Sequence, residues 1–352
     1  MKVLITGGCG FLGSNIAASY LAEGAEVVVI DAFLRTGGRD NLSWLQSQAV
    51  VSQLTHHEID VADDVAVNEA FRRHGPVDYV CHLGGQVAMT TSLSDPRRDF
   101  RTNALGTFNI LEAVRAHSPD ALVAYSSTNK VYGDLAHLDY QEGPTRFMVP
   151  SHPKGFDEAL SLDFASPYGC SKGAADQYVR DWNRNFDLET VVFRHSSIYG
   201  GRQFATFDQG WIGWFCQKAV EQKRARAEGR GTERFTISGT GKQVRDVLHA
   251  EDLVRLYRCA WERRAGVAGE IFNIGGGLDN SLSLLELFTL LENKLCLTAP
   301  LDFTRTPRRK SDQDFFVADI GKAARLLGWS PRVSSSVGID RMLEWVNRGP
   351  LR

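Results

Sequence analysis

The sequence predicts an α/β protein built around a doubly wound parallel sheet. Two observations indicate this fold: short β-branched runs alternate with helix-length amphipathic segments, and the first run leads directly into a series of glycines. Parallel strands require crossover connections, and helices of this length supply them on both faces of the sheet. The predicted strands are 3–6, 26–30, 52–57, 79–83, 122–126 and 190–194. The predicted helices are 11–23, 63–74, 96–116 and 167–184.

The first strand ends in glycines spaced G-x-x-G-x-x-G, at Gly7, Gly10 and Gly13. Gly7 permits a tight turn, Gly10 lets the backbone approach a ligand, and Gly13 lets the following helix pack closely on the strand. That helix begins at Phe11 and Leu12, and its N-terminus offers unpaired N–H groups to an anion. The pattern predicts a pyrophosphate site of the Rossmann type.

The second strand ends at Asp31, about twenty residues after the glycines. Its carboxylate is placed to accept hydrogen bonds from both hydroxyls of an adenosine ribose, and it would repel a 2′-phosphate. We therefore expect NAD rather than NADP as the cofactor. Arg35 follows closely and is included among the predicted cofactor-binding residues.

The later strands and helices carry a candidate catalytic set. Tyr168 and Lys172 are four residues apart, so they share one face of the helix that starts after Pro167. A phenol is a poor base at neutral pH, but the charges of Lys172 and of a nicotinamide ring are expected to lower the pKa of Tyr168. Thr128 follows the fifth strand at the carboxyl edge of the sheet, where it is placed to hydrogen-bond a reacting oxygen.

After residue 194 the chain becomes rich in glycine and aromatic residues, and strand and helix patterns return near 245. This change predicts a second, smaller lobe that interrupts the first. We assign residues 1–198 and 246–276 to a cofactor-binding domain, and 199–245 and 277–352 mainly to a substrate-binding lobe.

Composition narrows the class of protein. A formal net charge of −2 gives no electrostatic basis for binding nucleic acid or an anionic membrane, and no apolar run is long enough to span a bilayer. The six cysteines show no paired spacing, so we expect reduced thiols and no disulfide framework. Because no export signal precedes the first strand and no apolar run is of membrane-spanning length, we expect a cytoplasmic location. His56 and His57 have no third ligand in view, so no metal site is predicted.

Together, the glycines, Asp31, Thr128 and the Tyr168-x-x-x-Lys172 pair resemble the extended short-chain dehydrogenase/reductase superfamily, in particular its sugar-nucleotide epimerases and dehydratases. The resemblance covers essentially the whole chain. Several segments resemble one group of these enzymes more specifically, the 2-epimerases of CDP-sugars. These segments are 86–92, 126–133, 193–197, 203–211 and 311–313.

The resemblance implies the roles of further residues. Asp60 would contact the adenine, Lys172 would hold the nicotinamide ribose, and His195 would lie near the nicotinamide. The remaining residues implied on the cofactor side are Leu83, Gly84, Gln86 and Asn103. The residues implied on the substrate side are Gln209, Trp211, Arg245 and Arg309, with the arginines clamping a pyrophosphate.

One departure from relatives narrows the reaction. The dehydratases carry an Asp-Glu pair after the threonine, whereas this chain has Asn129-Lys130, which cannot serve as that acid and base. Dehydration is therefore not expected, and the resemblance implies epimerisation of a CDP-sugar by transient oxidation at C2 and return of the hydride to the opposite face. The alternatives left open are a 2-epimerase of CDP-glucose, a 4-epimerase of a UDP-hexose, and a non-catalytic NAD-binding scaffold or sensor. A homo-oligomer is expected by analogy.

Overall fold

A computed structural model of the chain describes residues 1–50, 52–309 and 312–348. Its largest element is a parallel seven-stranded sheet in the order β12-β8-β5-β4-β1-β2-β3, which confirms the predicted fold class. The order reverses between β1 and β4, and the carboxyl edge at such a point is where doubly wound sheets bind nucleotides. The strands are β1 (Lys2–Thr6), β2 (Glu26–Asp31), β3 (Leu54–Glu58), β4 (Tyr79–His82), β5 (Leu122–Thr128), β8 (Thr190–His195) and β12 (Glu270–Ile274).

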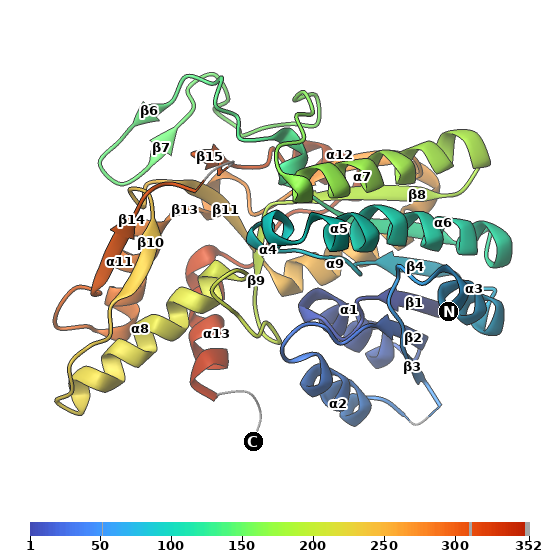
Figure 1. Cartoon of the computed structure of the whole chain (residues 1–352), viewed down its shortest axis with the longest axis horizontal. Coiled ribbons are helices and arrows are strands. Elements are labelled where there is room, and N and C mark those ends of the chain that lie inside the picture. The colour runs from blue at the N-terminus through green and yellow to red at the C-terminus, as the bar shows by residue number, and fades with distance from the viewer. Residues whose placement is uncertain (51, 310–311, 349–352) are drawn as a thin grey trace.

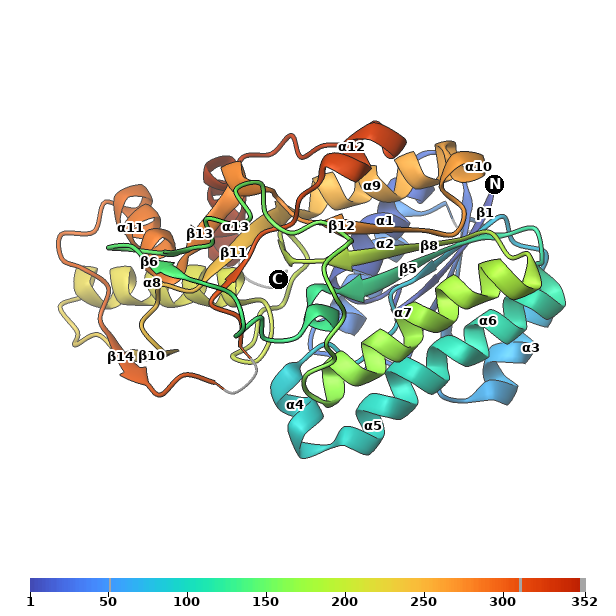
Figure 2. The same ribbon diagram turned by 90° about the horizontal axis from the view of Figure 1, so that it is seen from above.

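Helices cover both faces of this sheet (Figures 1 and 2). Alternate strand residues face opposite cores: Val3 and Ile5 pack with α1, α2 and α9, whereas Leu4 and Val28 pack with α3, α6 and α7. The helices are α1 (Phe11–Ala22), α2 (Gly38–Gln48), α3 (Asp64–His74), α4 (Met89–Ser94), α5 (Pro96–Phe100), α6 (Gly106–His117), α7 (Pro167–Phe186), α9 (Ala250–Glu262), α10 (Arg264–Val267) and α12 (Gly321–Leu327).

A smaller lobe lies beside the carboxyl edge of the sheet (Figure 2). Its core contains Phe215, Phe235 and Phe288, which form edge-on and tilted aromatic contacts. The lobe contains α8 (Trp211–Ala227), α11 (Leu284–Leu295), α13 (Ser335–Arg348), β9 (Ser197–Tyr199), β10 (Phe235–Ser238), β11 (Val244–His249), β13 (Ser281–Ser283), β14 (Phe303–Thr306) and β15 (Phe315–Phe316). A separate hairpin is formed by β6 (Gln141–Glu142) and β7 (Phe147–Met148).

The predicted helix 96–116 is confirmed as one unbroken helical span, but part of it is not α-helical. One π-helical turn covers Arg101–Leu105 between α5 and α6, and the Thr107 hydroxyl donates a 2.6 Å hydrogen bond to the carbonyl of Asn103 within it. Helices α2 and α4 were not predicted from the sequence. The polar helix α2 buries Leu42 and Leu45 against the sheet, so tertiary packing stabilises it rather than a strong sequence pattern.

The chain passes between the two lobes more than once. β11 pairs with β9, β13 and β15 of the small lobe, whereas α9 and β12 return to the large sheet. The proposed division at residues 198, 245 and 276 stays a prediction. Within the described ranges, no helix combines the length and apolar character needed to cross a membrane.

Candidate functional site

The large sheet and the small lobe enclose a cavity of about 560 Å³. Most of the predicted site residues line it, although they come from distant parts of the chain. They are Gly7, Gly10, Phe11, Leu12, Gly13, Asp31, Arg35, Asp60, Leu83, Gly84, Thr128, Tyr168, His195, Gln209, Trp211, Arg245 and Arg309. Three other predicted residues, Gln86, Asn103 and Lys172, are not part of the wall.

The glycine turn between β1 and α1 leaves no room for side chains. Gly7 has a φ of +65°, and a Cβ on it would lie 2.9 Å from the backbone nitrogen of Gly84. A Cβ on Gly13 would lie 2.2 Å from the carbonyl oxygen of Gly7. The first turn of α1 is therefore held against the ends of β1 and β4, with its N-terminus at the cavity.

Two carboxylates lie at the neighbouring strand ends. Asp31 accepts hydrogen bonds from the backbone N–H groups of Cys9 at 2.9 Å and Phe33 at 2.8 Å. Burial raises the pKa of Asp31, and these N–H groups oppose the shift. Asp60, just after β3, accepts from the N–H of Ala62 at 2.9 Å. Both carboxylates are thus fixed by the backbone at the edge of the cavity.

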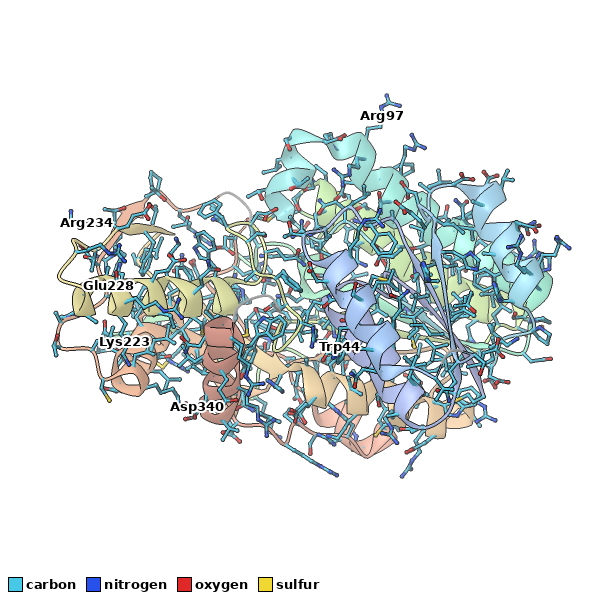
Figure 3. The ribbon with its side chains drawn as sticks, turned by 90° about the horizontal axis from the view of Figure 1, so that it is seen from below. Trp44, Arg97, Lys223, Glu228, Arg234 and Asp340 are labelled. Carbon is cyan, nitrogen blue, oxygen red and sulfur yellow. The ribbon has the colours of Figure 1, made fainter. Side chains whose placement is uncertain are left out.

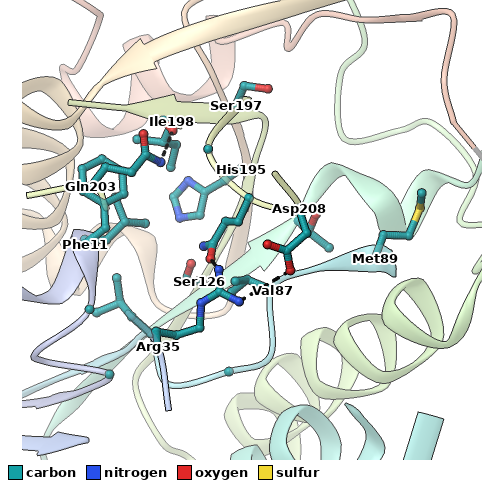
Figure 4. A pocket seen from close by; sticks show the side chains of 18 of the residues that line it. Phe11, Arg35, Val87, Met89, Ser126, His195, Ser197, Ile198, Gln203 and Asp208 are labelled. Carbon is teal, nitrogen blue, oxygen red and sulfur yellow. Dashed lines mark hydrogen bonds and ion pairs between the residues drawn. The ribbon is translucent and has the colours of Figure 1, made fainter. Parts of the chain in front are cut away.

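Arg35 connects the large domain with a segment of the small lobe. Its guanidinium donates to the side-chain oxygen of Gln209 and lies 3.8 Å from the carboxylate of Asp208 (Figure 4). Asp208 also accepts a 3.4 Å hydrogen bond from Thr91 on α4. Arg35 therefore bridges two parts of the cavity wall, an interaction that its position in the sequence did not indicate.

Thr128 and Tyr168 meet at the carboxyl end of β5. Thr128 ends the strand, and its hydroxyl oxygen accepts the backbone N–H of Lys130 at 3.2 Å. Ser166 caps α7 and Pro167 starts it, which places Tyr168 in the first turn of the helix. Burial raises the pKa of Tyr168 to about 12, while its interaction with the Thr128 hydroxyl lowers it.

Lys172 lies behind the cavity wall rather than in it. Its ammonium donates a 2.5 Å hydrogen bond to the carbonyl of Ser126 and lies 4.3 Å from the ring centre of Tyr125. Burial lowers the pKa of Lys172 to about 7, and Asp176 is the nearby charge that opposes this shift most. The expected lowering of the Tyr168 pKa is not seen in the chain alone, because burial and the nearby Asp99 charge raise it and only the Thr128 hydroxyl opposes them.

Gln86 and Asn103 belong to a buried network next to this set. The Asn103 amide accepts from the backbone N–H of Gln86 at 2.8 Å and donates to the Ser171 hydroxyl at 3.0 Å. The Gln86 side chain donates to Asp99 at 2.9 Å. These contacts satisfy both amides, and the contact of Gln86 with the cofactor stays a prediction. The network supports Gly85 and Val87, which do line the cavity.

His195 ends β8 and faces the cavity (Figure 4). Burial and, to a smaller extent, the Lys172 charge lower its pKa to about 3, so the ring is neutral. Neither ring nitrogen has a hydrogen-bond partner among the described residues. Nearby, Trp211 at the start of α8 donates its indole N–H to the Ser197 hydroxyl at 3.0 Å.

The far wall is positively charged. Arg245 on β11 donates to the carboxylate of Asp312 at 2.7 Å, and Lys130 lies 3.5 Å from the same carboxylate. The Arg309 guanidinium lies 5.3 Å from the ring centre of Phe207. Lys130 and Asp312 also line the cavity, although neither was predicted as a site residue from the sequence. Ser311, which belongs to the segment 311–313 of the resemblance, lies outside the described residues.

The cavity residues fit a dinucleotide. The side-chain-free turn at Gly7 and Gly13 admits a pyrophosphate, and Asp31 presents a carboxylate one strand away. The ring nitrogens of His195, which have no partner among the described residues, are free to hydrogen-bond a polar group of a ligand in the cavity. Among residues 1–50, 52–309 and 312–348, no group of three His, Cys, Asp or Glu side chains is arranged to hold a metal ion.

Comparisons with known proteins agree with this arrangement. The chain is 53% identical over 347 residues to the CDP-paratose 2-epimerase of Salmonella typhi, and the match covers 99% of each chain. It is 30% identical over 360 residues to dTDP-glucose 4,6-dehydratase 1 of Escherichia coli, with 98% of this chain and 92% of the relative covered.

Solved structures give the same result. The UDP-glucose 4-epimerase of Thermotoga maritima, determined with UDP-glucose, has a TM-score of 0.80 at 27% identity, with 99% of each chain covered. The UDP-glucose 4-epimerase of Thermus thermophilus, determined with NAD, has a TM-score of 0.79 at 26% identity, covering 99% of this chain and all of that one.

A family model described as the NAD dependent epimerase/dehydratase family matches residues 3–275. The dependence on NAD stated for this family confirms the cofactor predicted from the glycines and Asp31. The match includes β1 through β12, so it spans the whole large sheet. The chain belongs to the NAD dependent epimerase/dehydratase family.

Proposed function

We propose that the protein is an NAD-dependent 2-epimerase of a CDP-sugar that converts CDP-paratose to CDP-tyvelose. The observation that carries this proposal is the 53% identity to the Salmonella typhi CDP-paratose 2-epimerase over 99% of both chains. The cavity supports it, because nucleotide-binding glycines, the Thr128–Tyr168 pair and a cationic wall lie together in one enclosure.

The large domain would hold the cofactor. The turn at Gly7, Gly10 and Gly13 would receive its pyrophosphate, Asp31 its adenosine ribose and Asp60 its adenine. His195 would face its nicotinamide end. When bound, NAD supplies a hydride acceptor that becomes the hydride donor in the return step.

The chain's own residues would move the proton. The C–H bond of a sugar carbon that bears a free hydroxyl is not acidic, so simple deprotonation cannot invert that carbon. Inversion by transient oxidation is available instead, and it requires removal of the hydroxyl proton as the carbon is oxidised. Tyr168 Oη would take this proton as general base, and Thr128 would position the sugar oxygen. Because burial holds the pKa of Tyr168 at about 12 in the chain alone, the phenolate needs a further positive charge, which the oxidised nicotinamide ring brings.

The residues that follow Thr128 do not suit a dehydration reaction. Asn129 donates its amide N–H to the side chain of Gln313 at 2.9 Å, and it has no ionisable group. Lys130 is a cation where dehydratases carry a carboxylate. Without a carboxylic acid and a carboxylate base after Thr128, the site lacks the groups that would eliminate water.

The test is to incubate the purified protein with CDP-paratose, CDP-glucose or UDP-glucose, without adding cofactor, and to follow the anomeric proton by NMR. Conversion of CDP-paratose to CDP-tyvelose supports the proposal and shows that NAD is retained. Conversion of CDP-glucose or UDP-glucose alone reassigns the substrate to one of the alternatives. No conversion even with added NAD favours a non-catalytic NAD-binding protein.

We also propose that the protein is a cytoplasmic homo-oligomer. All six cysteines are free, which suits a reducing compartment. Three aromatic side chains on neighbouring helices are substantially exposed, namely Phe100, Tyr178 and Phe186. A surface of this kind is typical of an interface between subunits. Light scattering after size-exclusion chromatography measures the subunit count directly, and a monomer would contradict this proposal.

A further inference from the structure

Lys130 occupies a position in the cavity that the mechanism above leaves unused. It follows Thr128 by two residues in the short 3-10 turn Asn129–Tyr132, and its backbone N–H binds the Thr128 hydroxyl. Its ammonium lies 3.5 Å from the Asp312 carboxylate, which Arg245 also contacts. The side chain of Lys130 is only 16% exposed. Lys130 therefore links the threonine that faces the reacting oxygen to the arginine expected at the diphosphate.

The charges around Lys130 favour an anion. Asp312 is shared by Lys130 and Arg245, and Arg308 donates to the Asp312 backbone carbonyl at 2.6 Å. Arg308 also pairs with Asp314 at 3.0 Å. At the cavity wall itself, Lys130 and Arg245 thus share the single carboxylate of Asp312, which leaves an excess of positive charge there. A phosphate is the part of a sugar nucleotide that matches this excess.

The chemistry of the substrate places a phosphate near the reacting carbon. In a nucleotide sugar the diphosphate is attached at C1, and C2 is bonded directly to C1. When the C2 oxygen lies between Thr128 and Tyr168, the β-phosphate must be close by. In oxidation at C4 the diphosphate would lie across the sugar ring from the reacting carbon. A cation adjacent to Thr128 is therefore useful for reaction at C2 and misplaced for reaction at C4.

We propose that Lys130 binds the β-phosphate of the sugar nucleotide and thereby presents C2, rather than C4, to Thr128 and Tyr168. This inference rests on the proposed function, because it requires a C2-reacting nucleotide sugar as substrate. Asp312 keeps the flexible lysine stem directed along the wall. The anchored phosphate also serves as a fixed point while the sugar turns its other face during epimerisation.

The environment of Lys130 makes this contact dependent on pH. Burial, together with the charges of Arg245 and Arg308, lowers the pKa of Lys130 to about 8 against the opposing charge of Asp312. The ammonium therefore begins to lose its charge at a pH where an ordinary lysine is still fully protonated. An arginine at position 130 would keep its charge throughout this range.

The test compares the binding of CDP and CMP, which differ by the β-phosphate, using isothermal titration calorimetry. The proteins are the wild type, Lys130→Met, Lys130→Arg and the control Lys223→Met, an exposed lysine on α8 (Figure 3). At about pH 7, Lys130→Met should weaken CDP binding about 10- to 100-fold and leave CMP binding unchanged, as expected for loss of a bond between two charged groups. Lys223→Met should bind both nucleotides like the wild type.

The pH series provides a second readout. At about pH 9.5, wild-type affinity for CDP should fall toward that of Lys130→Met, while Lys130→Arg should keep its neutral-pH affinity. Equal losses for CDP and CMP in Lys130→Met, or no loss for either, would overturn the inference. If Lys130→Met does not fold, the Lys130→Arg series decides alone.

Failure of the proposed function is a separate result. The same titrations are run with UDP and UMP, so the contact with the β-phosphate is tested with whichever nucleotide the wild type binds. A wild type that binds the uridine pair and converts only UDP-glucose overturns the CDP-sugar assignment and the C2 argument together. A wild type that converts CDP-paratose while Lys130→Met binds CDP normally overturns the Lys130 inference alone.

Discussion

Replacing Tyr168 with phenylalanine removes one hydroxyl from the cavity and leaves the ring in place. If Tyr168 is the general base, kcat should fall by about 10²- to 10⁴-fold, the range for loss of a positioned proton acceptor. This corresponds to roughly 3 to 5.5 kcal/mol of transition-state stabilisation. The folded state loses much less, because the hydroxyl interacts with Thr128 and a single hydrogen bond contributes about 1 kcal/mol. Activity and stability should therefore separate.

The assay is the NMR measurement of epimerisation, with thermal unfolding and retained NAD measured on the same samples. The control is Tyr178→Phe, because Tyr178 lies on the same helix α7 but is 43% exposed and outside the cavity wall. We expect Tyr178→Phe to keep wild-type activity, and Tyr168→Phe to keep its NAD with a Tm within a few degrees of the wild type. Near-normal turnover by Tyr168→Phe would refute the assignment of the base.

Three further predictions concern two residues of the cofactor site and a pair of histidines on β3 and α3. Gly13→Ala should release NAD and lower the unfolding free energy by about 1–3 kcal/mol, since its Cβ would lie 2.2 Å from the Gly7 carbonyl oxygen; cofactor content and chemical denaturation measure both. Asp31→Ala should weaken NAD binding about 10- to 100-fold and reduce discrimination against NADP, as competitive titration would show. Stability should fall as the pH drops below about 6.5, because the pKa values of His57 and His74 are lowered by burial first and then by neighbouring positive charge.

The sign of the pH effect follows from the lowered pKa values. The Nε2 atoms of His57 and His74 are 2.8 Å apart, and a hydrogen bond between them needs at least one neutral ring. The unfolded chain binds protons at a higher pH than the folded one, so this contribution is present above about pH 6.5 and is lost as the pH falls through the folded values. A His57→Gln variant should show a shallower acid slope. An unchanged slope would contradict the prediction.

Matched controls accompany the cofactor variants. Gly231→Ala introduces a Cβ with no heavy atom within 4 Å, so it should keep NAD and stability. Asp40→Ala removes an exposed carboxylate from α2 and should leave the preference for NAD unchanged. Loss of NAD in either control, or retention of NAD by Gly13→Ala, would contradict the assignment of Gly13 and Asp31 to the cofactor site.

Local patterns predicted much of the architecture. Short β-branched runs marked strands of the large sheet, and the glycine spacing marked the turn at its carboxyl edge, because both depend on conformations that neighbouring residues impose. Helix α2 was not predicted, because its stability comes from Leu42 and Leu45 packing on the sheet rather than from a strong local pattern. The π-helical turn at Arg101–Leu105 had no signal in the apolar periodicity.

The structure brings most of the predicted site residues together at the cavity, and their contacts with a cofactor stay predictions. Gln86 and Asn103 lie behind the wall, where the Gln86 backbone N–H donates to the Asn103 amide and Asn103 donates to Ser171. Lys172 shares a helix face with Tyr168, as its spacing required, but its ammonium turns to the Ser126 carbonyl. Burial then lowers the pKa of Lys172 itself, an effect that depends on packing and cannot be read from spacing.

The sequence alone determined the alternating α/β order, the side-chain-free turn at Gly7 and the shared helix face of Tyr168 and Lys172. Each of these depends on residues close together in the chain. Only the tertiary structure decided that Lys130 and Arg245 share Asp312. These partners are far apart in sequence, and electrostatic interactions depend on distance and burial in space, which no local pattern encodes.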